Sequence, residues 1–136
     1  MITWIFYDRF TNKKMSATGA CIGAIVGLVA ITPAAGFVNL GQSVFIGFVA
    51  AIVSNISIRL TKKTKIDDTL DVFPSHGVGG IVGMILTAVF ANEVGLIYGH
   101  KETFLYHLLA IVIVTVFTLL MSYLLYKTVN FMMPLR

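Results

Sequence analysis

The sequence predicts an all-α integral membrane protein with four complete transmembrane helices and a partial helix at the N-terminus. Of the 136 residues, 57% are hydrophobic and only 12% are charged, a balance far from that of a soluble globular domain. Four separate apolar runs each approach the roughly 20 residues that cross the hydrocarbon layer, and most basic residues lie between these runs. A soluble core of this size could not hide four such runs, so the bilayer must solvate them.

Short polar intervals separate the apolar runs, so the chain is predicted to form one membrane domain over residues 1–136. The segment 1–10 is too short to cross a bilayer. It is also wrongly flanked for a signal peptide, because its basic residue follows the apolar stretch. We expect it to be the tail of a helix that begins earlier. The four predicted spans are 15–37, 43–60, 71–91 and 104–126.

The first span contains a small-residue stripe and a helix breaker. Gly19, Gly23 and Gly27 recur at every fourth position, which predicts that another helix packs closely there, although glycine is common in membrane helices in general. Pro33 cannot donate to the carbonyl of Val29, so it should bend or end the helix, and that carbonyl must find another partner. The fourth span has no such stripe, as expected of a helix that largely faces lipid.

The basic residues determine the predicted orientation. Nine of the ten lie before the first span, between the second and third, or after the fourth, whereas the other two loops hold only Lys101. By the positive-inside rule, the three basic segments and the C-terminus are cytoplasmic in a multi-pass protein of the cell membrane. The nine residues on that side are Arg9, Lys13, Lys14, Arg59, Lys62, Lys63, Lys65, Lys127 and Arg136.

His76 is the strongest candidate for a functional side chain. It lies inside an apolar span, where an ionisable group is costly and usually faces a cavity or a partner. A structural histidine bonded to a neighbouring carbonyl is the alternative. On an α-helix of about 100° per residue, small side chains share its face, which predicts that the histidine turns toward protein or a narrow lumen and not toward lipid. These neighbours are Gly79, Gly80, Gly83 and Thr87.

Three acidic residues precede this histidine. Asp67, Asp68 and Asp71 lie where the third span begins, so they are expected to cap free N–H groups and complement the helix dipole. Asp68 is too far for a direct pair with His76, because eight residues at 1.5 Å each amount to about 12 Å. A pair between Asp71 and His76 requires an irregular backbone, which Pro74 permits.

No pattern in the sequence supports an enzyme, a metal site or a cofactor. Cys21 has no partner in the chain, which excludes a disulfide or cysteine metal site within it. His100 and His107 lie in or near an outer loop, where solvated side chains need no special function. Walker loops, nucleophile triads and metal-ligand spacings are absent. The net charge of +4 follows membrane topology and does not form a nucleic-acid-binding patch.

Two long runs resemble signature segments of Amt-type ammonium transporters. They are GAIVGLVAITPAAGFV at residues 23–38 and DDTLDVFPSHGVGGIVGMILTAVFA at residues 67–91, and the resemblance extends over essentially the whole chain. It implies that the four spans correspond to helices eight to eleven of the eleven-helix, inverted-repeat transporter fold. It further implies ammonium or ammonia as the substrate and a homotrimer in membrane lipid.

The resemblance also assigns roles to individual residues. His76 corresponds to the second member of a twin-histidine pair in a narrow apolar pore, and Val72 and Thr32 would line that pore. Asp68 corresponds to the acid eight positions before the histidine. The structural residues expected near the pore are Asp68, Asp71, Gly79, Gly80 and Gly83.

The chain departs from the family pattern in two places. Pro74-Ser75 precedes the histidine where the family more often has Gly-Val, which leaves the local backbone open. The cytoplasmic tail that receives PII-type regulators in the family is absent from this sequence. Two alternative functions stay open. The first is an Rh-type ammonia or gas channel, which the segment ITPAAGFV disfavours. The second is a non-transporting membrane scaffold or subunit that pairs with a separately encoded half.

Overall fold

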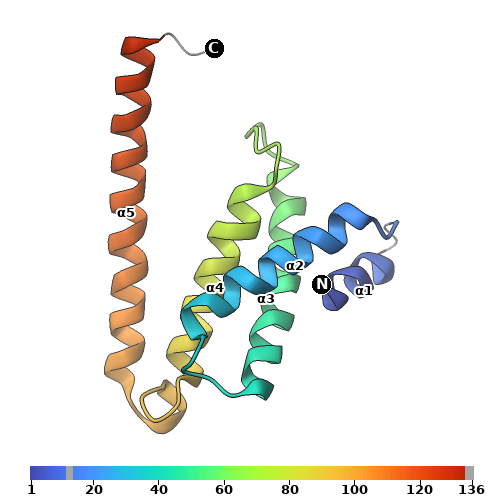
Figure 1. The fold of residues 1–136 in the computed structure, drawn as a ribbon, viewed down its shortest axis with the longest axis vertical. Helices are drawn as coiled ribbons and strands as arrows, with labels where there is room; N and C mark the ends of the chain where they lie inside the picture. The colour runs from blue at the N-terminus through green and yellow to red at the C-terminus, as the bar shows by residue number, and fades with distance from the viewer. Residues whose placement is uncertain (12–13, 134–136) are drawn as a thin grey trace.

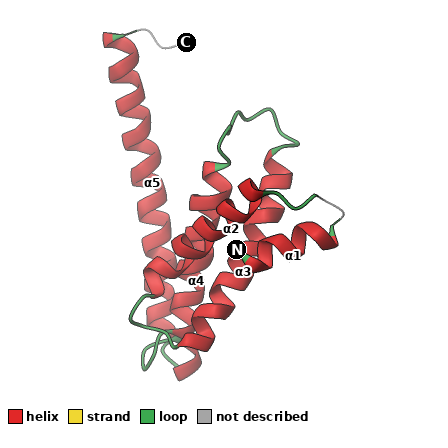
Figure 2. Ribbon diagram, turned by 45° about the vertical axis from the view of Figure 1, so that its right-hand side comes forward, coloured by secondary structure: helices red, strands yellow, loops and turns green. Residues whose placement is uncertain are grey.

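The computed structural model describes residues 1–11 and 14–133, and all regular elements in these ranges are helical (Figure 2). Four helical units are long and apolar enough to cross a membrane, which confirms the predicted number of spans. In chain order, the elements are α1 (Ile2–Phe10), α2 (Ala17–Ile31), the 3₁₀ turn η1 (Thr32–Ala34), α3 (Leu40–Thr61), the π-helical η2 (Phe73–Val78), α4 (Gly79–Phe90), the 3₁₀ turn η3 (Leu96–Tyr98) and α5 (Lys101–Met132).

The ends of these units differ from the predicted spans for local reasons. The third unit begins at Phe73 and not at residue 71, because Asp71 has φ +52° and cannot belong to a right-handed helix. The fourth unit is 32 residues long, nine more than predicted. No glycine or proline interrupts the chain between Gly99 and Pro134, so the helix continues past the apolar run.

Pro33 ends α2, as the sequence predicts. The helix stops at Ile31 and gives way to η1. The carbonyl that Pro33 leaves free, on Val29, accepts the backbone N–H of Thr32. The Thr32 hydroxyl donates to the carbonyl of Leu28 at 2.7 Å. The carbonyls of the last turn therefore find partners within the helix itself.

The glycine stripe of α2 receives α1 at two of its three positions. A Cβ on Gly23 would lie 2.5 Å from Cβ of Trp4, and one on Gly19 would lie 3.3 Å from both the Trp4 indole nitrogen and an Asp8 carboxylate oxygen. A Cβ on Gly27 would meet nothing within 4 Å. The prediction of close helix packing is confirmed at Gly19 and Gly23, whereas no described residue packs against Gly27.

The bundle core lies where α2, α3 and α4 cross, and small residues allow the close approach. A Cβ on Gly83 would lie only 2.3 Å from the carbonyl oxygen of Ala30, so the backbones of α4 and α2 nearly touch. Ala30, Ile46 and Ala50 are fully buried around this crossing. In contrast, α5 has no buried residue, and its C-terminal part extends away from the bundle (Figure 1).

Replacing Gly83 with alanine is expected to destabilise the bundle, because the new methyl group overlaps a backbone carbonyl that cannot rotate away. Overpacking of this kind costs about 1–3 kcal/mol. Gly27→Ala is the matched control, since it makes the same change on a helix where the structure has open space, and alanine favours helices over glycine. Thermal unfolding in detergent should show a lower midpoint for Gly83→Ala alone. Equal midpoints for both variants would contradict the close crossing.

Candidate functional site

His76 lies in the π-helical turn η2, at the start of the third membrane span. Its side chain is exposed, and it makes no side-chain hydrogen bond within the described ranges. The alternative of a structural histidine bonded to a neighbouring carbonyl is therefore not observed. The imidazole is therefore available to interact with a ligand or with another chain segment.

His76 is exposed, whereas most of the small residues that the α-helical pattern places on its face are buried. Gly79, Gly83 and Thr87 are buried, and a Cβ on Gly79 would contact Ser54 of α3 and Val26 of α2. A π-helical turn has i→i+5 bonds and therefore more residues per turn than an α-helix. Each residue of η2 therefore rotates by less than the roughly 100° of an α-helix, so the angle between His76 and the glycines differs from the one that the α-helical pattern gives. The orientation of His76 toward protein or a narrow lumen stays a prediction.

Asp68 caps the start of η2. Its two carboxylate oxygens accept the N–H groups of Val72 and Phe73, at 2.8 and 2.9 Å, which confirms the predicted capping role. Asp67 does not cap the helix, since its carboxylate accepts the hydroxyl of Thr69 at 3.0 Å. This hydrogen bond lies within the loop that precedes η2.

Asp71 has a different role from the predicted one. Its carboxylate lies 3.2 Å from the ammonium nitrogen of Lys62, at the end of α3, and makes no bond to His76. Its carbonyl oxygen accepts the Ser75 backbone N–H at 3.1 Å and the Ser75 hydroxyl at 2.6 Å. Pro74, second in η2, is buried and needs no hydrogen bond at this position. The irregular backbone that the sequence allows is present, but it directs the carboxylate to lysine.

The other two predicted lining residues lie on different surfaces. Val72 is about half exposed and immediately precedes η2. Thr32 lines an apolar groove of about 660 Å³ between α2, α4 and α5, which Phe73, Gly77 and Met84 also line. His76 and Val72 are not among the residues that line this groove. The structure of this chain does not bring Thr32 and His76 into one cavity.

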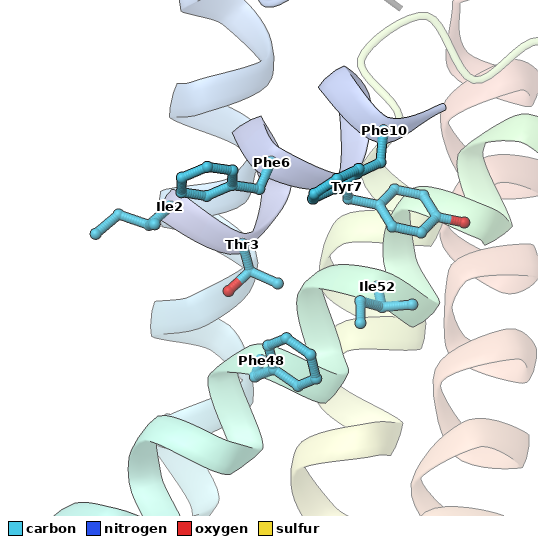
Figure 3. Close-up of a pocket in the computed structure, with 7 residues that line it drawn as sticks. All are labelled: Ile2, Thr3, Phe6, Tyr7, Phe10, Phe48 and Ile52. Carbon is cyan, nitrogen blue, oxygen red and sulfur yellow. The ribbon is translucent and has the colours of Figure 1, made fainter. Parts of the chain in front are cut away.

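A second apolar cavity, of about 470 Å³, lies between α1 and α3 (Figure 3). Sequence reasoning missed it, although aromatic residues four apart in the segment 1–10 were a usable signal. None of the predicted site residues lines it. Its lining residues are Ile2, Thr3, Phe6, Tyr7, Phe10, Phe48 and Ile52.

A buried polar network that the sequence analysis did not identify joins α1 to α3. Asn55, which is buried, donates its side-chain amide to a carboxylate oxygen of buried Asp8 at 3.1 Å and accepts the Arg59 Nε–H at 3.2 Å. Arg59 also donates to the Thr11 hydroxyl and lies 4.8 Å from the ring centroid of Tyr7. Arg59 is thus a packed helix residue and not a loop residue. Polar side chains in an apolar bundle are costly unless paired, so this network holds the two helices in register.

Comparison with known proteins places these features in a family context. Residues 1–136 match the profile of the Ammonium Transporter Family. The chain is 40% identical over 134 residues to a putative ammonium transporter of Methanothermobacter thermautotrophicus, covering 92% of this chain and 33% of that protein. It is 40% identical over 141 residues to an ammonium transporter of Bacillus subtilis, covering 98% of this chain and 35% of that protein.

The structural comparison agrees with the sequence comparison. The crystal structure of Saccharomyces cerevisiae Mep2 matches with a TM-score of 0.87 and 35% sequence identity, over 95% of this chain and 32% of the Mep2 chain. Candida albicans Mep2 matches equally well, with a TM-score of 0.87. The chain thus spans about a third of the length of the relatives it matches.

Proposed function

Because this chain belongs to the ammonium transporter family, we propose that it forms one wall of a path that carries ammonium or ammonia across a cell membrane. In this proposal its helices correspond to helices eight to eleven of the transporter fold, and an inverted first half supplies the opposite wall. His76 would face the path as one member of a histidine pair, with Val72 lining the path near it, and Thr32 would line a separate stretch of the path.

The observation that carries this proposal is the free imidazole of His76. It is the one Asp, Glu, Lys, Arg or His residue within the third span, Phe73–Phe90, and it is exposed on an irregular turn with no partner in the described ranges. An imidazole can donate and accept hydrogen bonds, so it can hold an amine. The apolar side chains beside it, Val72 and Phe73, disfavour a dehydrated K⁺ ion, which has no hydrogen bonds to offer in exchange for its water.

The path requires a wall opposite His76. The other surfaces of this chain suit contacts with further subunits and with membrane lipid. Helix α5, which has no buried residue, offers a long apolar surface to membrane lipid or to other subunits of a homotrimer. The C-terminus is proposed to be cytoplasmic, on the side where a PII-type regulator acts in the family. The ammonium-transporter relatives favour ammonium over the alternative of an Rh-type gas channel.

A chimera tests the proposed function. The matching third of the B. subtilis ammonium transporter is replaced by this chain, and saturable methylammonium uptake is measured in proteoliposomes. We expect uptake that unlabelled ammonium inhibits. The 136-residue chain by itself is expected to be inactive, because it supplies a single histidine on one open wall. A correctly inserted chimera without uptake would favour the scaffold alternative, and saturable uptake by the isolated chain would show that no opposite wall is needed.

A further inference from the structure

We propose that the ion pair between Lys62 and Asp71 is a positioning device that sets the direction of His76. This inference deepens the proposed function, on which it rests for its biological meaning. It assigns to Lys62, at the end of α3, an effect on a side chain in a different helical unit. Neither residue contacts the substrate in this proposal, since both act through the backbone of η2.

Asp71 adopts a backbone conformation that other residues must stabilise. Asp71 and Glu93 are the two non-glycine residues with positive φ in the described ranges, and this left-handed conformation is costly for residues with a side chain, though least so for Asn and Asp. Glu93 lies in an exposed turn, whereas Asp71 is buried. The Asp71 N–H donates to the carbonyl of Asp68 at 3.1 Å, and its carboxylate reaches Lys62. These contacts select the left-handed conformation over the extended alternatives.

Asp71 is connected to His76 through Ser75. The Asp71 carbonyl accepts two hydrogen bonds from Ser75, one from its backbone and one from its hydroxyl. Ser75 is buried and is the residue immediately before His76. A rotation of the Asp71 peptide would therefore move Ser75, and the adjacent backbone would carry the imidazole with it.

Lys62 is well placed to stabilise this conformation of Asp71. Lys62 directly follows α3, and α3 packs against η2. Its side chain is 65% exposed, whereas that of Asp71 is 11% exposed. The lysine is thus a clamp at the surface, and its removal leaves the packed core of the bundle untouched. A change at Lys62 can therefore alter the direction of His76 without unfolding the chain.

The test is a histidine-specific NMR experiment on the full chain in lipid nanodiscs. Isotope-labelled histidine gives three ring signals, from His76, His100 and His107, and His76→Gln identifies the first. Lys62→Met and Asp71→Asn are each expected to shift and broaden the His76 signal while the other two stay in place. Lys62→Arg keeps the charge and should retain the native signal. Lys63→Met, which removes a neighbouring exposed lysine with no ion pair in the described structure, is the matched control.

Each outcome of this experiment decides the inference. An unchanged His76 signal in Lys62→Met would overturn it, as would an equal shift of all three signals. In the chimera, the same two variants should lower the maximal uptake about tenfold with little change in KM, because a misdirected group can cost up to about a hundredfold in rate. If every chimera is inactive while the His76 signal moves as expected, the proposed function fails and the positioning role stands.

Discussion

Uptake of methylammonium by the chimera is expected to fall about tenfold or more when His76 is replaced by leucine. The leucine side chain is similar in volume but cannot hydrogen bond, and the loss of a hydrogen bond to a charged ligand costs about 1.5–3 kcal/mol, which corresponds to about tenfold or more. His76 is exposed and has no partner in the described chain. Its replacement thus removes no packing that holds these helices together.

The variant His76→Glu distinguishes the effect of hydrogen bonding on uptake from the effect of charge on selectivity. A glutamate can still accept a proton, so we expect partial uptake, but its negative charge also attracts other cations and should weaken the discrimination against K⁺. His107→Leu is the matched control, because His107 lies in another span and bonds the carbonyl of Thr103 in its own helix. Uptake and current are measured on the same preparations, with subunit assembly checked by size. Normal, selective uptake through an assembled His76→Leu chimera would remove this residue from the mechanism.

The membrane-spanning units were predictable because each rests on a local rule. Apolar runs of about 20 residues indicate spans, and Pro33 ends α2 as its missing N–H requires. The close α1–α2 contact at Gly23 follows from the small-residue stripe. The longer α5 was missed because hydropathy marks the apolar run, whereas helix ends depend on glycine, proline and capping groups.

The arrangement around His76 was less predictable, because it depends on contacts between segments. A helical pattern of 100° per residue assumes a regular helix, and the π-helical turn breaks that assumption. Pro74-Ser75 was a sequence signal that the backbone departs from the usual pattern. The conformation of this backbone segment depends on the ion pair between Asp71 and Lys62, which lies at the end of α3. Likewise, Asp8 and Asn55 are 47 positions apart, so their pairing appears only in the folded chain.

The loops gather at two opposite ends of the molecule, and the basic residues among them predict which end is cytoplasmic. In the structure, the 62–72 segment and the C-terminal end of α5 lie at one end of the molecule, and the 35–39 and 92–100 segments lie at the other (Figure 1). The basic residues Lys62, Lys63 and Lys65 belong to the first end. Lys13 and Arg136, which also contribute to the charge bias, lie outside the described residues. The bias predicts which end is cytoplasmic, since basic loops are retained inside.

Single cysteines are expected to react with an impermeant thiol reagent on one side of the membrane and not on the other, which reports this orientation. In a Cys21→Ser background, needed because Cys21 is exposed, cysteines replace Leu40, Lys101 or Lys63, all of which are exposed. An impermeant thiol reagent added to intact cells should react at positions 40 and 101 and not at position 63. After the cells are permeabilised, position 63 should react as well, which shows that its thiol is accessible. Reaction at position 63 alone in intact cells would mean that the basic loops face outward, because the two ends of the bundle cannot share one side of the membrane.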